Sequence, residues 1–592
     1  MNDFLKMVGA VICGFIVMGL LGFVFFAGCV GTLVSSESQP VLPRSGVLKM
    51  DLSDVAFAEQ SVSDINPSAL LTGGSMTQTI GLLDAVRALE TAAEDPAVKY
   101  LYLTPDGCTA GPAQVEELRA ALLRFRSSGK AVIAYTENPT TGSYYLASAA
   151  DKVYMSANAG ASPMITGVGS QLFFLGDLLK ELGINVQLIR HGKYKSAGEM
   201  YVRNAPSPEN LEQNQAMVNS VWDSFASDIA ESRDITVDHL NGLLDGLKLV
   251  TAQDMVDAGL ADALMTREQL KEKLADLAVA DKFADVKMIP LEDYIAAKVK
   301  PNLKARQKIA IIYAEGSIVD GNGRQEVAGD YFASRIAKVR EDDDIKAVVL
   351  RVASPGGSVL ASDKIKAEID LLRAEKPVIA SYGNYAASGG YWISNSCDRI
   401  YSDRTTLTGS IGVFSMIPDA SGTLKNKLKI GVATVGSSKH SGMLSLLSPL
   451  DAEETDYMQK SIEIIYNEFV NNVAEGRGMT PEQVDEIAQG RVWTGADALE
   501  IGLVDEIGTL SDALHFAAQA GGDTDLGAWQ IVTYPKAMTT MDLLLESLQG
   551  SGGEDVLAGT PFAPVGEAFR NWTFETGDRF MARMPYEMII GF

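Results

Sequence analysis

The chain combines a long apolar run near its start with shorter apolar segments of two periodicities. Residues 7–30 contain no charged side chain. Further along, β-branched runs such as KAVVLRV (346–352) are typical of buried strands. The following segment, 361–375, has helical spacing, which places three apolar residues on one face: Ile365, Ile369 and Leu372. Repeated strand–helix–strand alternation predicts an α/β fold built from parallel βαβ units.

The apolar run at residues 7–30 is long enough to cross a bilayer, which takes about 20 residues. Lys6 in the short segment 1–6 predicts that this end stays in the cytoplasm and that the body lies outside. A cleaved signal peptide has a shorter apolar region, of about 7–15 residues. FAGC, ending at Cys29, loosely resembles a lipoprotein processing site, so acylation is the alternative to a span. Residues 31–46 read as a linker.

An internal repeat organises the rest of the chain. Three blocks recur in the same order, two at a separation of 247 residues and one at 243: 93–111 with 340–358, 141–156 with 388–403, and 251–264 with 494–507. The pattern predicts two tandem copies of one domain. Their bounds are a first repeat at 47–290, a linker at 291–306, a second repeat at 307–520 and a C-terminal tail at 521–592.

The amino-acid composition limits which binding partners and cofactors we expect. The formal charge of −26 argues against nucleic acid, which needs clustered Lys and Arg. The four cysteines and four histidines are scattered, and no C-x-x-C pair occurs. We therefore expect neither a zinc site nor a disulfide framework, and no cofactor.

Two turns in the second repeat carry the candidate chemistry. Pro355, Gly356 and Gly357 follow one predicted strand, and Ser388 and Gly389 follow the next. Neighbouring strand ends would bring a hydroxyl and exposed backbone amides to one rim. Acyl transfer needs that combination, a nucleophile with donors aimed at the developing oxyanion. A glycine-rich packing contact is the plain alternative.

The first repeat serves as an internal control for that alternative. Thr141 stands at the position of Ser388, and residues 107–110 (GCTA) stand at the position of 354–357 (SPGG). A packing device would be needed in both copies, whereas the serine and the P-G-G turn occur in one. The comparison favours a catalytic Ser388.

A serine nucleophile needs a base. His191 or His440 would suit a triad. The other option is a lysine whose pKa is lowered by desolvation, and Lys195 lies in a small-residue loop, GKYKSA.

Several motifs together resemble the long form of bacterial signal peptide peptidases, the protease IV family. They are SPGGS (354–358), AASGGYWIS (386–394), TLTGSIGVF (406–414), GKYKSA (192–197) and RVWTGADALEIGLVD (491–505). The resemblance covers most of residues 47–520 and the N-terminal anchor, and it does not cover the tail.

The resemblance implies a serine–lysine dyad protease with a fold like those of ClpP and crotonase. Ser388 matches the nucleophile and Lys195 the general base, with backbone amides near Gly356, Gly357 and Gly389 as oxyanion donors. It also implies a homotetramer anchored in the bacterial inner membrane, with the catalytic body facing the periplasm. The substrates would be cleaved signal peptides and similar apolar peptides.

Three alternatives stay open. Lys439 lies 244 residues after Lys195, so the second repeat holds a rival base of its own. A crotonase-type acyl-CoA hydratase, isomerase or hydrolase also uses a glycine turn as an oxyanion hole. The third alternative is that the chain is an inactive scaffold or a partner of membrane proteins.

Overall fold

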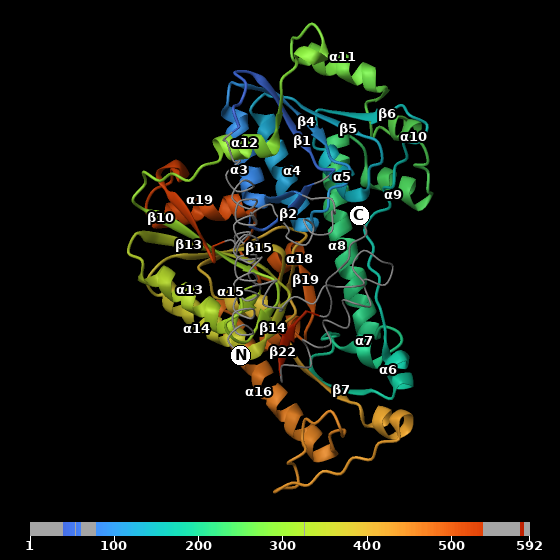
Figure 1. Cartoon of the computed structure of the whole chain (residues 1–592), viewed down its shortest axis with the longest axis vertical. Helices are drawn as coiled ribbons and strands as arrows, with labels where there is room; N and C mark the ends of the chain where they lie inside the picture. The colour runs from blue at the N-terminus through green and yellow to red at the C-terminus, as the bar shows by residue number, and fades with distance from the viewer. Residues whose placement is uncertain (1–39, 54, 61–77, 325, 537–579, 585–592) are drawn as a thin grey trace, which may run out of the picture.

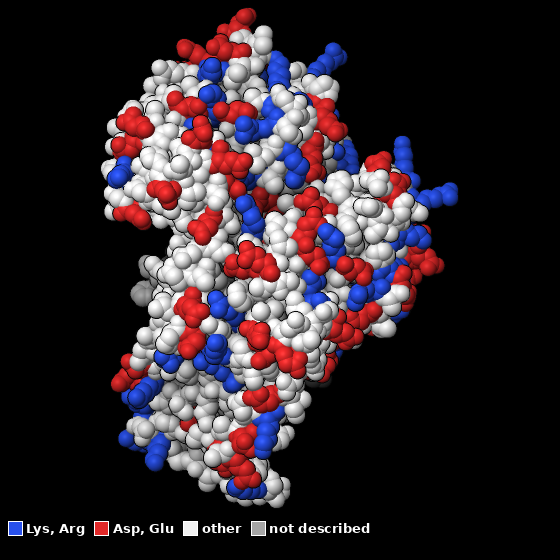
Figure 2. All heavy atoms as spheres, turned by 180° about the vertical axis from the view of Figure 1, so that it is seen from behind, with Lys and Arg blue, Asp and Glu red and all other residues white. Residues whose placement is uncertain are grey.

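The computed structural model describes residues 40–53, 55–60, 78–324, 326–536 and 580–584. The predicted membrane anchor at 7–30 lies outside these residues. Within the described part of the chain, no helix is both long enough and apolar enough to cross a bilayer. Figure 2 shows acidic and basic side chains intermixed over one face of the molecule.

The first repeat forms a six-stranded parallel sheet. Its strand order is β8-β6-β5-β4-β1-β9, and every neighbouring pair is parallel. The strands are β1 Gly46–Asp51, β4 Val98–Thr104, β5 Val132–Thr136, β6 Lys152–Ser156, β8 Ala263–Met265 and β9 Met288–Pro290. Helices of the same copy pack on this sheet: α3 Leu82–Glu94, α4 Pro112–Ser127, α5 Thr141–Ala147, α8 Pro208–Arg233 and α12 Leu291–Lys298.

The second sheet repeats this plan below the first (Figure 1). Its parallel strands run β20-β16-β15-β13-β10-β21, and β17 adds to the end of β15 with β19 antiparallel beyond it. The strands are β10 Lys308–Glu315, β13 Ile345–Ser354, β15 Val378–Ala387, β16 Arg399–Ser402, β17 Leu407–Gly409, β19 Val492–Thr494, β20 Glu506–Ile507 and β21 Gln530–Tyr534.

The helices confirm the tandem repeat. α3 has its counterpart in α13 (Gly329–Glu341), and α8 has its counterpart in α16 (Ala452–Arg477). α14 (Val359–Arg373) corresponds to α4, and the three residues predicted to share its buried face are at most 1% exposed: Ile365, Ile369 and Leu372. β21, within the predicted tail, takes the place beside β10 that β9 takes beside β1.

Shorter elements complete the two copies. They are β2 Val55–Ala58, β3 Gln78–Gly81, α6 Gly176–Leu182, α7 Glu199–Val202, α9 Val237–Asp245, α10 Ala252–Asp257, α11 Arg267–Leu277, α15 Gly389–Ser394, α17 Pro481–Ile487, α18 Gly495–Glu500 and α19 Leu510–Gly521.

A third sheet joins the two copies. Its order is β12-β11-β14-β22-β18-β7. β7 (Asn185–His191) comes from the first repeat, yet it pairs antiparallel with β18 (Val413–Asp419) of the second over seven residues. The remaining strands are β11 Ile318–Val319, β12 Val327–Ala328, β14 Gly356–Ser358 and β22 Met581–Arg583. The pairing brings the loop after β7 to the strand ends of the other copy.

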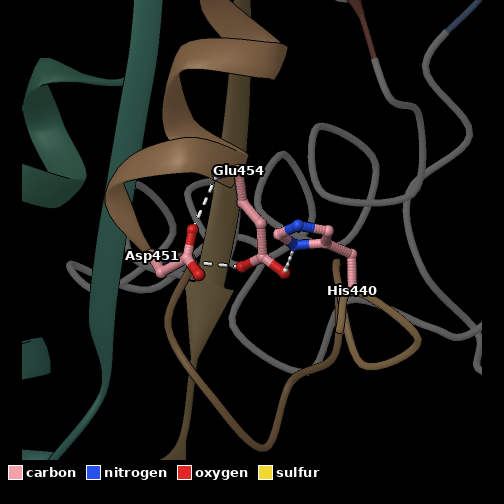
Figure 3. Close-up of side chains that lie close together, drawn as sticks. All are labelled: His440, Asp451 and Glu454. Atoms are coloured by element: carbon pink, nitrogen blue, oxygen red, sulfur yellow. Dashed lines mark hydrogen bonds and ion pairs between the residues drawn. The ribbon is translucent and has the colours of Figure 1, made fainter. Parts of the chain in front are cut away.

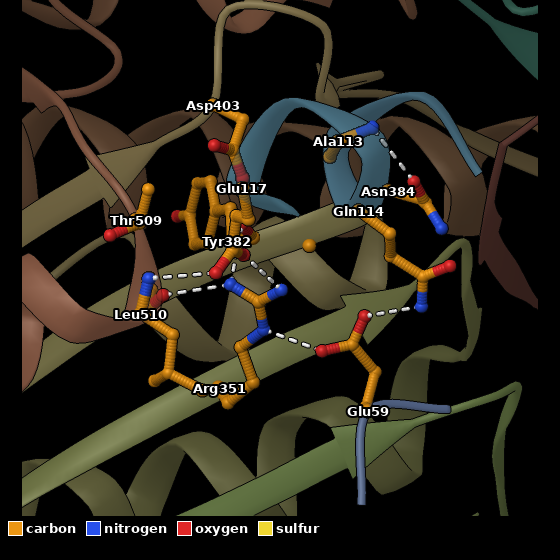
Figure 4. A network of polar contacts seen from close by, with 12 residues as sticks. Glu59, Ala113, Gln114, Glu117, Arg351, Tyr382, Asn384, Asp403, Thr509 and Leu510 are labelled. Atoms are coloured by element: carbon orange, nitrogen blue, oxygen red, sulfur yellow. Dashed lines mark hydrogen bonds and ion pairs between the residues drawn. The ribbon is translucent and has the colours of Figure 1, made fainter. Parts of the chain in front are cut away.

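A buried cluster of charges also links the copies (Figure 4). Arg351 on β13 donates through Nε to Glu59 at 2.7 Å and through a terminal nitrogen to Glu117 at 2.6 Å. Its other terminal nitrogen donates to Ser381 Oγ and to the Tyr382 carbonyl on β15. Both glutamates belong to the first copy, so one guanidinium ties that copy to the two strands that lead to the candidate site.

Candidate active site

Ser388 occupies a tight turn between β15 and α15. Its backbone has φ 56° and ψ −111°, a conformation that non-glycine residues rarely adopt. The turn is fixed on both sides, since the Ser388 N–H donates to the Gly409 carbonyl and the Trp392 N–H donates to the Ser388 carbonyl, each at 2.7 Å. Ser388 is fully buried. The surrounding structure therefore holds the hydroxyl in one strained position.

Lys195 of the first copy reaches this hydroxyl. Its Nζ lies 2.8 Å from Ser388 Oγ, 2.9 Å from the Ser410 carbonyl oxygen and 3.0 Å from Ser410 Oγ, all within hydrogen-bond distance. Lys195 and Ser410 are both fully buried. Burial removes the hydration that stabilises an ammonium ion, and the three neighbouring oxygens carry no charge. The setting favours an amine that can take a proton.

The loop that carries Lys195 is docked on the second copy. The Tyr194 N–H donates to the Gln489 carbonyl at 2.9 Å. A Cβ added to Gly490 would lie 2.5 Å from Lys195 Cβ, so the two backbones meet where only glycine fits. This contact fixes the backbone end of the Lys195 side chain, while Ser410 orients the amine at the other end.

Glu199 holds the same loop from the other side. It accepts hydrogen bonds from Arg190, from the Ser207 N–H and from Asn210. Burial raises the pKa of Glu199, but the Ser207 and Asn210 hydrogen bonds and the Arg190 charge together bring it below its usual value. Arg190 also donates to the Lys195 carbonyl at 2.6 Å. An ionised Glu199 thus anchors the arginine that braces Lys195.

The glycine turn after β13 lies beside the residue that follows Ser388, since a Cβ added to Gly356 would lie 2.5 Å from the Gly389 nitrogen. A Cβ on Gly357 would be 1.9 Å from the Ile318 carbonyl oxygen, and one on Gly389 would be 2.7 Å from Ser362 Oγ. The Gly356 N–H is directed to Ser354 Oγ at 3.2 Å. The Gly356 amide thus has a contact within its own turn. Gly357 and Gly389 remain as candidate oxyanion donors.

The other predicted bases lie elsewhere. Lys439 is 64% exposed and pairs with Glu453, so the structure does not bring this rival to Ser388. His191 Nδ1 contacts Glu463 at 2.6 Å, and its ring stacks on Tyr466.

His440 belongs to a surface cluster with Asp451 and Glu454 (Figure 3). Their potential ligand atoms lie within 4.8 Å of one another, a donor set that would suit a metal ion. The carboxylates already have structural tasks, however. Asp451 caps α16 by accepting the Glu453 and Glu454 N–H groups, and Glu454 accepts from the Asp451 N–H. The cluster is accounted for as a helix cap.

Two features of the site were missed by the sequence reasoning. Ser410 was part of the motif TLTGSIGVF, but nothing assigned it a contact with the lysine. β22 pairs with β14 directly at the glycine turn, although the tail was predicted only as a separate segment. The available signal for Ser410 was a serine directly after a glycine in this motif. No local pattern marked β22.

Known proteins are similar to this chain along most of its length. The model of peptidase family S49 matches residues 124–281 and 370–522. Protease 4 of Haemophilus influenzae is 35% identical over 525 residues, which span 86% of this chain and 83% of the relative. The chloroplastic serine protease SPPA of Arabidopsis thaliana is 34% identical over 72% of this chain and 64% of the relative. A putative signal peptide peptidase SppA of Enterococcus faecium is 37% identical over 36% of this chain and 62% of the relative.

Proposed function

The chain belongs to peptidase family S49 and is a serine protease, and from that premise we propose that it degrades cleaved signal peptides and similar apolar peptides with a Ser388–Lys195 dyad. The observation that carries the proposal is the 2.8 Å contact between Lys195 Nζ and Ser388 Oγ, made between the two copies. The substrate class follows the family resemblance and the name of the relative from Enterococcus faecium.

The proposed reaction is acyl transfer in two halves. Ser388 Oγ attacks the peptide carbonyl carbon while the neutral Lys195 amine takes the hydroxyl proton. The proton then passes to the leaving amine, and an acyl ester remains on Ser388. Water, deprotonated by the same lysine, hydrolyses that ester. The Ser410 carbonyl and hydroxyl orient the amine throughout.

The developing oxyanion is assigned to the Gly357 and Gly389 amides. Each such donor contributes about 10²–10³ in rate in comparable sites. Gly356 supports the turn by directing its N–H to Ser354. Its own role is then to leave room for the approaching peptide, because it has no side chain.

The crotonase-type alternative loses its support. The family and the curated relatives reported above are proteases, and none of them is an acyl-CoA hydratase or isomerase. A glycine turn that forms an oxyanion hole fits both chemistries, so that turn alone did not distinguish them.

We further propose that residues 7–30 anchor the protein in the bacterial inner membrane, with the catalytic body facing the periplasm. The uncharged run of residues supports the anchor, and Lys6 supports the orientation. The ClpP- and crotonase-like fold belongs to the same proposal, supported by two parallel α/β sheets in tandem.

A homotetramer completes the proposal, and the repeat itself supports association. β7 of the first copy pairs with β18 of the second. By the repeat, the counterpart of β7 is residues 429–435, which are exposed, with Val435 97% exposed. The counterpart of β18 is residues 166–172, which form no strand. Pairing of these two segments between neighbouring chains would continue head to tail and close a ring.

The dyad is tested by three variants of the full chain in detergent. Ser388→Ala and Lys195→Met should each lower the hydrolysis of an apolar signal-sequence peptide by at least about 10³-fold. Lys439→Met is the matched control, because it removes an equivalent lysine from the other repeat and should keep full activity. A fluorophosphonate probe, located by mass spectrometry, should label Ser388.

The outcomes separate the alternatives. Full activity in Lys195→Met with loss in Lys439→Met would show that the base is the rival lysine. Loss of activity in His191→Ala or His440→Ala, with both lysine variants active, would replace the dyad with a triad. Labelling at another serine would reject Ser388.

A further inference from the structure

Gln213 contacts the chain on both sides of the proposed base. It lies in α8 of the first copy and is fully buried. Its side-chain nitrogen donates one hydrogen to the Tyr194 carbonyl at 3.0 Å and the other to Ser196 Oγ at 2.8 Å. Tyr194 and Ser196 are the neighbours of Lys195 in the chain. One amide group therefore holds the residue before the lysine and the residue after it.

Lys195 is the middle residue of a three-residue turn. The Ser196 N–H donates to the Tyr194 carbonyl at 2.7 Å, which closes the turn over Lys195. The Tyr194 carbonyl accepts two hydrogen bonds, one from the turn and one from Gln213. Because Gln213 binds both ends of this turn, it fixes the direction in which the lysine side chain leaves the backbone.

The oxygen of the same amide binds the second copy. The Val492 N–H donates to Gln213 Oε1 at 3.3 Å. Val492 lies in β19, opposite Gly409 of β17. The Gly409 carbonyl accepts the Ser388 N–H, and Ser410 follows Gly409 directly. Gln213 thus ties the lysine loop to the strand pair that holds both the nucleophile and Ser410.

The helix gives Gln213 a fixed place on that strand pair, and α8 runs beside β19 in Figure 1. Met217 lies one helical turn after Gln213 on the same face, and it shares a buried apolar cluster with Leu407 of β17 and Val492 of β19. The partners also determine the orientation of the amide. In the reverse orientation its oxygen would face the Tyr194 carbonyl and its nitrogen would face the Val492 N–H.

The second copy offers an internal comparison. Lys439 lies 244 residues after Lys195, and the same separation leads from Gln213 to Tyr457 and from the start of α8 to the start of α16. Tyr457 is 63% exposed, and Lys439 is also at the surface. The buried amide therefore accompanies the lysine that meets Ser388, and its equivalent beside the other lysine is an exposed tyrosine.

We propose that Gln213 is a positioning residue for the reaction: it holds Lys195 at the distance from Ser388 at which the amine takes the hydroxyl proton. The inference rests on the proposed dyad. Gln213 has no exposed surface, so it acts without touching the peptide. Its loss should therefore lower kcat and leave KM unchanged.

Two variants of the full chain in detergent, assayed with an apolar signal-sequence peptide, test this role. Gln213→Leu removes the three hydrogen bonds and should lower kcat at least about 10-fold, because small displacements of a reacting group are costly. Gln213→Glu keeps the shape and the acceptor for the Val492 N–H, but its second oxygen donates at most one hydrogen where the amide nitrogen donates two. It should also lower kcat, and KM should stay within about 2-fold in both variants.

The pH dependence of kcat supplies a readout that lower stability alone would not change. The base must be neutral, so kcat rises with pH on the limb where the base loses its proton. A displaced amine gains water, which stabilises the ammonium form, so this limb should move to higher pH in Gln213→Leu. A carboxylate at this position also stabilises an ammonium ion, and Gln213→Glu should therefore shift the limb in the same direction.

Gln187→Leu is the matched control. Gln187 also joins the two copies through both ends of its amide, but its partners are the carbonyl and the N–H of Leu450. This variant should keep the kcat and the pH limb of the wild type, whatever its effect on the Tm.

Wild-type kcat and an unmoved limb in both Gln213 variants would overturn the positioning role and leave the dyad intact, whether or not the Tm falls. A higher KM with unchanged kcat would also overturn it, because Gln213 would then act on binding. So would an equal loss in Gln187→Leu, since any contact between the copies would then have the effect. If Gln213→Leu does not fold, Gln213→Glu decides by the same criteria. Peptide hydrolysis by Lys195→Met would instead overturn the proposed function.

Discussion

Replacement of Arg351 by methionine should destabilise the protein far more than the loss of a surface ion pair. Arg351 is fully buried between Glu59 and Glu117, which are at most 3% exposed at their side chains. Methionine fills much of the space but leaves two buried carboxylates without their counter-ion. Breaking a buried ion pair by removing one partner costs about 3–5 kcal/mol.

The upper end of that range applies here because the two carboxylates share one guanidinium. Burial already raises the pKa of Glu117 above its usual value, despite the attraction of Arg351. A loss of about 5 kcal/mol corresponds to a fall in Tm of roughly 10–20 °C for a cooperative unit of this size. The triple variant Arg351→Met with Glu59→Gln and Glu117→Gln removes all three charges. We expect it to recover at least half of that loss.

Calorimetry of the full chain, in the Ser388→Ala background to prevent proteolysis, measures these values. Arg373→Met is the control, since its pair with Asp398 is about 40% exposed and should contribute at most about 1 kcal/mol. A Tm for Arg351→Met within 2 °C of its parent would refute the reasoning. A triple variant no more stable than Arg351→Met would also refute it, because unpaired charge would not be the cause.

Three further variants address the site and its pH dependence. Gly490→Ala should lower kcat at least about 10-fold, because the new Cβ displaces Lys195. Gly478→Ala is the control, since Gly478 also has a positive φ but has open space around it. This control should leave kcat unchanged. Ser410→Ala keeps the carbonyl acceptor and loses one hydrogen bond, so kcat should fall by roughly 2- to 10-fold; no change would show that the hydroxyl does not orient the amine. Burial, with the charges of Glu117 and Glu116, raises the pKa of Asp403 well above its usual value, so the folded state holds a proton that the unfolded chain releases as the pH rises. The Tm advantage of Asp403→Asn over the wild type should therefore grow from pH 5 to pH 8, and a constant difference would contradict this linkage.

The arrangement of each copy could be predicted because it depends on local patterns. The face of α14 formed by Ile365, Ile369 and Leu372 followed from helical spacing, and it is buried. The repeat followed from blocks that recur at nearly constant separation. Such features depend on neighbouring residues in the chain, which the sequence displays directly.

The choice between Lys195 and Lys439 depends on contacts between distant segments. Both lysines occupy equivalent positions of the repeat, and neither the loop composition nor the spacing excludes either one. The difference is that β7 crosses to β18, which carries the Lys195 loop to Gln489 and Gly490. The strand pairing of the tail could not be predicted either. No local pattern reveals which sheet edge a short strand will join.

Backbone geometry separates the first copy from the chemistry that we propose for the second. Thr141, at the position of Ser388, begins an ordinary helix and is not among the residues with positive φ. Its hydroxyl accepts the Gly167 N–H and donates to the Gly167 carbonyl, so it is used to close a loop. A β-branched side chain strongly disfavours the strained φ of 56° that Ser388 adopts. Changing Thr141 to serine alone would therefore restore the hydroxyl without the turn that presents it, and the glycine turn would still be missing at residues 107–110.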